Sequence, residues 1–407
     1  MLRFLTAGES HGQALVAILE GMPSGLTVDE QVITTHLTRR QGGYGRGRRM
    51  AIEADRALII AGIRRGQTTG APIALQIANK DWPNWQKTMH VGPEAPPDAT
   101  GANRAPVTRP RPGHADLAGA LKYDLDDMRD VLERASARET AARVAVAAIA
   151  RQLLSHFNID VVSHVVTIGG VGLPESLAVP AAAVRAIPGD SPLRCVDPAT
   201  EQQMIAAIDA AREAGDTLGG AFEVIAAGLP VGLGSHVQWD RKLDGRLAQA
   251  IMSIPAIKAV GIGKGPGVAM LPGSRIHDEI VPIVPHGATG HEALGVARLT
   301  NNAGGLEGGV TNGEELRVTG YMKPIATLMQ PLRSVDMTTL EPSAAAIERS
   351  DVCAVTAAAV VGEAMVALTL ADAFLDKFGG DSLAEIEHNY AAYNRDVRAR
   401  FEVSSRP

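Results

Sequence analysis

Aromatic residues are scarce in this sequence, where Phe, Trp and Tyr together make up 3% of 407 residues. The core must therefore be built mainly from Ala, Val, Leu and Ile, and a surface that stacks nucleic-acid bases would have few rings to use. Cysteine is nearly absent too, since only Cys195 and Cys353 occur. Two cysteines far apart in sequence do not make a disulfide framework, so we expect a reducing, cytoplasmic location.

An excess of basic residues is also missing. Lys and Arg total 39 against 45 Asp and Glu, for a net charge of −6. This balance argues against a globally basic nucleic-acid-binding protein, so any anion site must be a local concentration of Arg. We expect no membrane span, because Arg143 and Arg151 interrupt the best apolar candidate. No signal peptide is expected, and no His, Cys or carboxylate pair has the spacing of a zinc site.

Strand and helix signals are spread along the chain. Strands are expected at 2–7, 57–63, 72–77 and 222–227, and a helix at 29–40 that ends at Gly42. Ser136 and Glu139 fit a capping box before an Ala-rich helix reaching about His156. Asp197-Pro198 begins another helix that ends at Gly215, and a second long apolar helix covers 355–378.

The two long helices are apolar around most of their circumference, so we expect both to be buried. Strands wrapped around two central helices predict an α+β fold with a layered body. No low-complexity linker divides the chain, and we interpret the Pro-rich stretch at 93–112 as an ordered or closing loop. We therefore expect a single domain over 1–407.

An Arg- and Gly-rich segment at 39–49 is the strongest anion-binding signal. It holds five Arg and four Gly in eleven residues. Arg suits bidentate phosphate and carboxylate recognition, and Gly lets a loop fold around an anion. An RNA-binding loop is the alternative, although Tyr44 is the one aromatic residue available for stacking there.

Two short motifs contain histidines suited to proton transfer. His11 lies in Gly-Glu-Ser-His-Gly at 8–12, and His114 lies in Arg-Pro-Arg-Pro-Gly-His-Ala-Asp at 109–116. A histidine between glycines can approach a ligand closely, and Asp116 could orient the His114 imidazole. A turn histidine bonded to backbone is the plainer alternative for His11.

Three further segments carry candidate binding residues. Arg134 and Arg138 flank an expected helix N-terminus at 133–140, where they could bind an anion, although Ser136 and Glu139 could simply cap the helix. A glycine-rich loop at 301–309 suits close contact with a planar cofactor. The segments 323–327 and 349–353 add a Lys, a Thr, and a carboxylate close to an Arg, for which surface ion pairing is the alternative.

Together, the order and spacing of these segments resemble the chorismate synthase family over 2–378. The resemblance implies a layered β-α-β sandwich, usually assembled as a homotetramer. It implies a lyase that eliminates phosphate and the C6 hydrogen from 5-enolpyruvylshikimate 3-phosphate in a 1,4-anti sense, giving chorismate. Reduced FMN is the implied cofactor, without net redox change.

The resemblance also implies roles for individual residues. His11 corresponds to a histidine at the substrate phosphate, His114 to one at the reduced flavin, and Asp351 to a proton-relaying aspartate. Arg40, Arg46 and Arg49 correspond to substrate-contacting arginines, and Arg40 and Arg46 also to NADP-binding positions. The implied FMN-binding residues are Arg134, Ala135, Ser136, Gln249, Ala250, Gly308, Lys323, Pro324, Ile325, Ala326, Thr327 and Arg349.

One departure concerns 349–353, where Ser350 stands in place of a histidine found in some relatives. Asp351 keeps its assignment, but any helper role of that histidine is lost. The sequence shows no added flavin-reductase module, so we expect a separate reductase to supply reduced FMN. A flavoprotein oxidoreductase that consumes NADPH is the rival enzyme class.

Overall fold

Two antiparallel sheets form the outer layers of the computed structural model, which describes residues 1–47, 54–174, 177–282, 296–348 and 350–400. The first sheet has the order β1 (Arg3–Ala7), β2 (Ala14–Glu20), β6 (Ile73–Ala78) and β3 (Ala57–Ala61). The second has the order β10 (Ile257–Ile262), β15 (Leu316–Met322), β9 (Gly220–Ala227), β7 (Asp160–Ile168) and β8 (Val171–Gly172).

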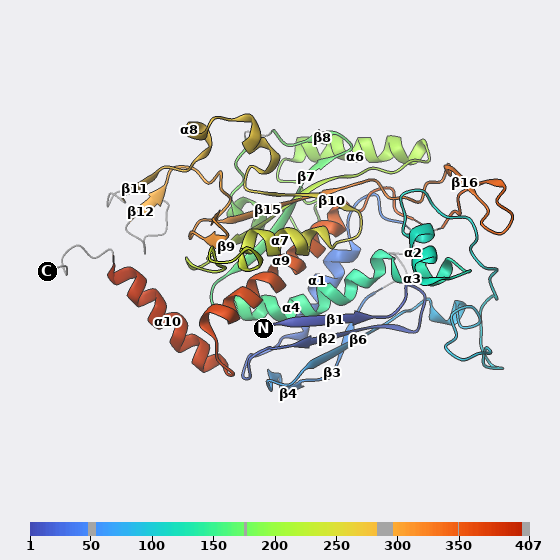
Figure 1. The fold of residues 1–407 in the computed structure, drawn as a ribbon, viewed down its shortest axis with the longest axis horizontal. Helices are drawn as coiled ribbons and strands as arrows, with labels where there is room; N and C mark the ends of the chain where they lie inside the picture. The colour runs from blue at the N-terminus through green and yellow to red at the C-terminus, as the bar shows by residue number, and fades with distance from the viewer. Residues whose placement is uncertain (48–53, 175–176, 283–295, 349, 401–407) are drawn as a thin grey trace.

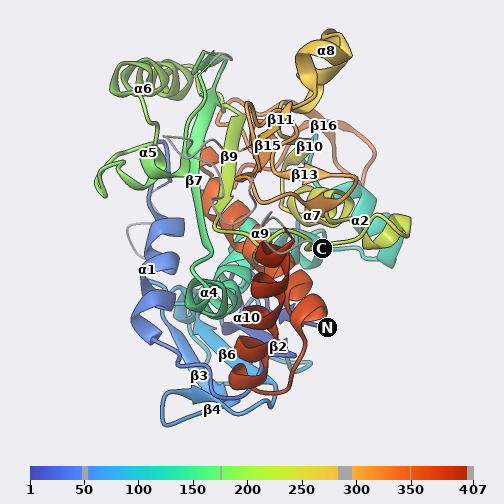
Figure 2. The ribbon, with the colours of Figure 1, turned by 90° about the vertical axis from the view of Figure 1, so that its left-hand side faces the viewer.

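Three helices fill the layer between the sheets: α1 (Glu30–Gln41), α4 (Thr140–His156) and α9 (Val355–Phe378) (Figure 1). Helix α4 packs on β1, β2 and β6, whereas α9 packs on β7, β9 and β15. The two helices also pack on each other, and the view from the side shows them between the sheets (Figure 2). The prediction of an α+β, layered β-α-β fold with buried Ala-rich central helices is confirmed.

Small side chains explain how these layers approach one another closely. Helix α4 buries six alanines along its length, among them Ala145 and Ala148. Phe222 of β9 is fully buried, and a Cβ on Gly320 or Gly362 would lie 2.5 or 2.4 Å from its ring. Glycine is therefore required at both positions, because no side chain has room beside that ring.

Helix α9 corrects the expectation that no segment could span a membrane. It is long and apolar enough to do so by length and composition alone. However, 89% of its most apolar window is buried against the rest of the protein. The apolar surface of α9 is thus accounted for by the core that it forms with α4 and the second sheet.

The helix signals read from the sequence are right in position. Helix α6 (Pro198–Glu213) begins as expected, with the Asp197 side chain accepting a hydrogen bond from Thr200 N. The capping box before α4 is wrong. Ser136 instead caps a short 3₁₀ helix, η3 (Ala137–Glu139), and the Glu139 carboxylate accepts hydrogen bonds from Thr6 and Arg143. The Glu139 side chain is thus used by Thr6 and Arg143.

The remaining elements lie around this body. The helices are α2 (Asp116–Tyr123), α3 (Arg129–Arg134), α5 (Ala181–Arg185), α7 (Leu243–Met252), α8 (Gly273–Ile276), α10 (Leu383–Ala399), η2 (Trp82–Asn84), η4 (Trp239–Arg241) and η5 (Gly265–Met270). The hairpins pair β4 (Ile63–Arg64) with β5 (Gln67–Thr68), β11 (Ile280–Pro282) with β12 (Val296–Arg298), β13 (Leu306–Glu307) with β14 (Val310–Thr311), and β16 (Arg333–Val335) with β17 (Pro342–Ala344).

Candidate active site

A buried cluster of arginines lies where the end of α1 meets the start of α4. Arg138 donates hydrogen bonds to both oxygens of Asp55 at 2.7 and 2.6 Å and to Asn79 Oδ1 at 2.9 Å. Arg40 lies 3.9 Å from the same carboxylate and donates to Thr140 Oγ1 and Ala137 O. Both arginines are about 5% exposed or less.

Positive charge exceeds negative charge around Arg40. Burial, followed by repulsion from Arg46, lowers the pKa of the Arg40 guanidinium to about 9. Its Nη1 has no hydrogen-bond partner among the described residues. A buried donor without an acceptor is costly, and an anionic ligand would satisfy it. The donor set therefore fits a phosphate or carboxylate group.

The Gly-rich loop brings Arg46 to Asp351. Arg46 Nη1 lies 3.3 Å from Asp351 Oδ2, and Gly47 N donates to Asp351 Oδ1 at 2.6 Å. Val352 N donates to Gly45 O at 2.9 Å. A Cβ on Gly45 would lie 3.2 Å from the Cys353 side chain, so these glycines let the loop lie directly against 350–353. The loop thus fits against protein rather than only around an anion.

His11 is held by Glu133, which the sequence analysis did not single out. The His11 Nδ1 lies 2.8 and 3.0 Å from the two carboxylate oxygens of Glu133, and the His11 backbone N–H donates to Oε2 at 2.8 Å. The imidazole also stacks on Trp85 with ring centroids 3.8 Å apart. A simple turn histidine bonded to backbone does not describe this arrangement.

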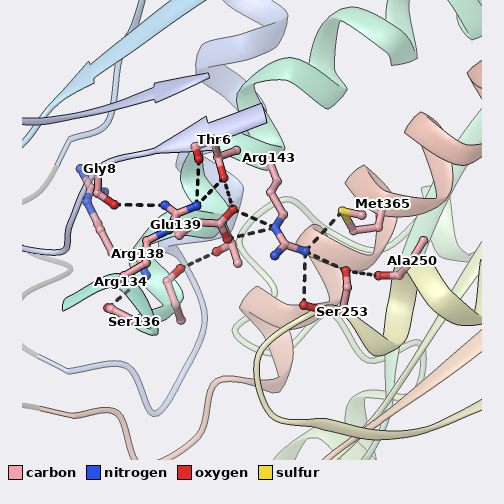
Figure 3. A network of polar contacts seen from close by, with 12 residues as sticks. Thr6, Gly8, Arg134, Ser136, Arg138, Glu139, Arg143, Ala250, Ser253 and Met365 are labelled. Carbon is pink, nitrogen blue, oxygen red and sulfur yellow. Dashed lines mark hydrogen bonds and ion pairs between the residues drawn. The ribbon is translucent and has the colours of Figure 1, made fainter. Parts of the chain in front are cut away.

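Ser10 and Ser136 connect His11 with the start of α4. Ser136 Oγ and Ser10 Oγ are 3.1 Å apart, and Ser10 N donates to Glu133 O. Arg134 turns the other way, toward the carbonyl groups of Thr6 and Gly8 at the end of β1 (Figure 3). The anion site expected from Arg134 and Arg138 together is therefore wrong, because the helix turn directs the two guanidinium groups to different partners.

His114 has the partner expected from its motif. Its Nδ1 lies 2.6 Å from Asp116 Oδ1, and Arg111 Nε donates to Asp116 Oδ2 at 2.8 Å. Burial alone would raise the pKa of Asp116, but hydrogen bonds from His114 and Arg111 lower it well below its usual range. Asp116 is therefore a fixed anion that orients the imidazole.

The 323–327 segment closes the other side of the His114 group. Arg111 Nη1 donates to Thr327 Oγ1 at 3.0 Å, and Lys323 Nζ donates to Gly113 O at 2.9 Å. Burial and the nearby Lys258 lower the pKa of Lys323. The structure thus joins two candidate segments that are about two hundred residues apart, 109–116 and 323–327.

A cavity of about 490 Å³ lies beside the candidate FMN segment 134–136. Its size is within the range of sites for cofactor-sized ligands. Its lining combines apolar side chains with charged groups and hydroxyl groups. The lining residues are Phe4, Leu5, Thr6, Arg134, Ala135, Ser136, Glu139, Arg143, Ser253, Pro255 and Met365.

Two more candidate FMN segments border this cavity. Arg143 Nη1 donates to Ser253 Oγ, which donates to Ala250 O at 2.7 Å, so the last turn of α7 that contains Gln249 and Ala250 lies at its edge. Lys323 N donates to Ala256 O, the neighbour of the lining residue Pro255. A lining of apolar side chains, two arginines and three hydroxyl groups fits a planar ligand that carries a phosphate.

Gly308 is not brought to this group within one chain. The loop before it bonds to the start of β15, since Arg317 N donates to Gly304 O, whereas Lys323 follows the end of that strand. The seven residues of β15 therefore separate the loop before Gly308 from Lys323 by roughly 20 Å. Arg49 and Arg349, two further candidates, lie outside the described residues.

Arg39 belongs to the core rather than to the site. It donates to both oxygens of Glu363 at 2.8 and 2.7 Å, and Arg151 donates to the same carboxylate at 3.1 Å. The sequence grouped Arg39 with the anion-binding arginines, and this grouping is wrong. Residues that the sequence analysis missed are Glu133, Trp85, Asp55 and Asn79. The rarity of Trp was the one available signal for Trp85.

Comparisons with known proteins identify the family of this chain. The family model described as chorismate synthase matches residues 2–375. A chorismate synthase of Moorella thermoacetica is 58% identical over 395 residues, covering 97% of this chain and 99% of the relative. One of Geobacter metallireducens is 54% identical over 396 residues, covering 97% and 98%. A crystal structure of a chorismate synthase, 41% identical, has a TM-score of 0.76 and covers 98% of both chains.

Proposed function

This chain belongs to the chorismate synthase family, and from that premise we propose how its residues carry out the family reaction. The protein is a lyase that forms chorismate in the shikimate pathway. The substrate is 5-enolpyruvylshikimate 3-phosphate, from which phosphate and the C6 hydrogen leave in a 1,4-anti elimination. The observation that supports this most strongly is the buried, incompletely paired Arg40 beside Arg46, Arg138 and Asp351.

The arginine cluster is suited to a substrate with a phosphate and two carboxylates. The net charge of the protein is −6, so its surface as a whole does not attract such a ligand. Arg40 and Arg46 come from one end of α1 and the loop after it, and Arg138 from η3, just before α4. Concentrated guanidinium groups in a buried site focus the field that an anion needs.

Reduced FMN is the cofactor that we propose for the cavity beside 134–136. When bound, the reduced flavin supplies electron density transiently to the carbon skeleton of the substrate, with no net oxidation. Arg134 and Arg143 supply positive charge at the cavity wall, and Phe4 and Met365 supply an apolar surface for the ring. The candidate FMN residues 249–250 and 323–327 border the same space.

Three side chains of this chain handle protons in the proposal. His11 acts as general acid toward the departing phosphate oxygen. His114, which Asp116 orients, protonates or stabilises the ring system of the reduced flavin. Asp351 accepts a proton at its carboxylate, which Arg46 and Gly47 N hold in place. All three lie outside helices and strands, on connecting segments, where catalytic groups are commonly found.

An anaerobic assay of phosphate release tests the reaction. The protein is mixed with 5-enolpyruvylshikimate 3-phosphate, with and without dithionite-reduced FMN. We expect many turnovers for each reduced flavin, because the elimination is redox neutral. One flavin oxidised for each product would contradict the proposal, and so would equal release without flavin. Substrate-dependent NADPH consumption would instead support a flavoprotein oxidoreductase.

Reduced FMN is proposed to come from a separate flavin reductase. Arg40 and Arg46 are also the proposed NADP positions, but Arg40 is only 4% exposed. A binding titration with NADPH, before and after addition of substrate, tests whether the two ligands compete for these arginines. Mutually exclusive binding is the expected result, because both ligands would use the same guanidinium groups.

Assembly into a homotetramer is proposed through the outer face of the first sheet. Leu5, Ile18, Leu58 and Ile60 are 71%, 41%, 64% and 56% exposed there. Leu5 pairs with Ile18 across β1 and β2, so the apolar side chains form a continuous band. Ala7, Ala74 and Gln76, which lie between them, carry no charge. Arg3 and Glu20 form an ion pair at one end of this face, and the uncharged apolar band beside them is typical of a contact surface between subunits.

Light scattering of sheet-face variants tests the assembly. Ile18→Lys and Leu58→Lys should each reduce the molar mass of the particle, because a charge would be buried in the contact. Val237→Lys is the matched control, since Val237 is 73% exposed on a different part of the fold. A tetramer that survives both substitutions would contradict this surface.

We also propose that residues 1–407 form one domain, and that the enzyme is cytoplasmic.

A further inference from the structure

The His11 ring is enclosed by two side chains whose purpose is not explained by folding alone. Glu133, at the end of α3, presents both carboxylate oxygens to His11 Nδ1 at 2.8 and 3.0 Å. Its carboxylate is fully buried. A buried carboxylate is costly unless charge or hydrogen bonds compensate it, and the imidazole and backbone N–H of His11 both contribute.

Trp85 covers one face of the imidazole. The two rings stack at 3.8 Å with an angle of 21° between their planes. The indole is itself fixed, because Trp85 Nε1 donates to Asp81 Oδ2 at 3.1 Å. The Arg104 guanidinium carbon lies 3.9 Å from the centroid of the indole ring. Two groups cannot share one face at that distance, so Arg104 lies on the face opposite His11.

These contacts determine the orientation of His11. The Glu133 carboxylate accepts a hydrogen bond from Nδ1 and so fixes the rotation of the imidazole in its plane. The Trp85 indole fixes the tilt of the imidazole. A carboxylate at one ring nitrogen selects the tautomer and stabilises the protonated ring. Nε2 is then the nitrogen on the side of the ring away from Glu133, and it is the atom that can act on a ligand.

We propose that Glu133 and Trp85 are positioning residues for His11 in the elimination. Glu133 keeps the proton-bearing Nε2 directed at the departing phosphate oxygen, and Trp85 keeps the ring from turning out of that line. This proposal rests on the proposed role of His11 as general acid. Neither residue touches the substrate, since both act through the His11 imidazole.

A double-mutant cycle separates positioning from stability. Glu133→Gln keeps the shape of the side chain but removes its negative charge, and only one of its two terminal atoms can still accept a hydrogen bond from His11. We expect kcat to fall roughly 10–100-fold with KM for substrate little changed. In a His11→Ala background the same substitution should change kcat by less than about twofold, because the group that it positions is gone.

A matched control is available in another buried glutamate. Glu201 accepts backbone N–H groups of Leu193 and Cys195 and is 8% exposed. Glu201→Gln should lower the melting temperature without changing the pH dependence of kcat. Glu133→Gln should move the alkaline limb of the kcat profile to lower pH, while the other charges near the stack, Asp81, Arg104 and Arg129, stay in place.

Fluorescence reports the same contact without turnover. Trp82→Phe and Trp239→Phe leave Trp85 as the single tryptophan. A protonated imidazole in contact with an indole quenches its emission, so emission should rise with pH as His11 loses its proton. Glu133→Gln should shift the midpoint of this rise to lower pH, and His11→Ala should abolish it.

The outcomes distinguish the two proposals. If His11→Ala keeps a near-normal rate, the proposed role of His11 fails, whatever Glu133 does. If His11→Ala loses activity while Glu133→Gln is equally harmful with and without His11, the positioning role is overturned. An unshifted fluorescence midpoint in Glu133→Gln would overturn it as well.

Discussion

Arg39 and Arg40 are adjacent in the sequence, yet their guanidinium groups bind partners on two different sides of α1. Arg39 forms a two-pronged ion pair with Glu363 in the middle of α9. Arg40 donates to Thr140 and Ala137 O at the start of α4, and it lies 3.9 Å from Asp55. Successive residues on a helix differ by about 100° in direction, so one arginine enters the core and the other the candidate site.

The first prediction uses this pair as its own control. Arg39→Gln should lower the free energy of unfolding by roughly 3 kcal/mol or more, because Glu363 loses half of its compensating charge in a buried position. Arg40→Gln should instead weaken substrate binding with a smaller loss of stability. Urea unfolding and a substrate-binding titration measure the two effects. Equal loss of substrate affinity in both variants would contradict the division.

The second prediction concerns the two histidines. His11→Ala and His114→Ala should each fold and bind FMN, and each should lose activity by roughly 10²–10⁴-fold. His11→Ala should slow phosphate departure, as measured by single-turnover phosphate release. His114→Ala should also change how the absorbance of bound reduced flavin varies with pH. Near-normal rates in both variants, with FMN bound, would show that neither histidine is catalytic.

The third prediction concerns Asp351, for which the structure removes one alternative. Asp351 does not cap α9, because the residue at the start of that helix is Ala354 and the carboxylate accepts from Gly47 N. Asp351→Asn can keep the Gly47 hydrogen bond but cannot act as a base. We expect near-normal stability and FMN affinity with turnover lowered on the order of 10²-fold or more.

A purely structural Asp351 would give a different result. Losing its ion pair with Arg46 would then lower stability by about 1 kcal/mol and leave turnover intact. Arg46→Ala provides the comparison, since it removes the same ion pair from the other side. That variant should weaken substrate affinity, whereas Asp351→Asn should mainly lower kcat. Melting temperature together with a kcat and KM split decides between these roles.

The fourth prediction is a loss of stability in mild acid. Burial, followed by the charge of Arg151, lowers the pKa of His36 to about 3, although Glu363 opposes the shift. The unfolded chain has the ordinary histidine pKa of 6.5 and so takes up the proton first. The contribution of His36 to stability is therefore complete above about pH 6.5 and declines as the pH falls from 6.5 toward 3.

Urea unfolding at pH 7.5 and pH 5.0 measures this decline. We expect His36 to account for about 2 kcal/mol of the decrease at most. His36→Gln should remove that part of the pH dependence, because its amide does not titrate. His156→Gln is the control, since the His156 side chain is 38% exposed and pairs with Glu387 at the surface. An identical pH dependence in His36→Gln and the parent protein would contradict the prediction.

The sequence by itself determined the elements that depend on local chemistry. Asp197 and Pro198 favour the N-cap and the first position of a helix, and this is where α6 has them. The Ala-rich segment that forms α4 has no polar face to turn toward solvent. The order of short motifs was also enough to indicate the chorismate synthase family, because each motif is a contiguous string of residues. Asp116 was found as the partner of His114 since the two lie two residues apart.

Only the tertiary structure decided which partners those motif residues have. Glu133 and His11 are 122 residues apart, Asp55 and Arg138 are 83 apart, and Arg39 and Glu363 are 324 apart. A motif gives the type of a side chain but not its direction or what lies across from it. An arginine is equally suited to a substrate phosphate and to a buried carboxylate. Which of the two it binds depends on how α1, α4 and α9 pack against one another. Local sequence cannot make that choice, because the compensating charge comes from a segment that the fold alone brings near.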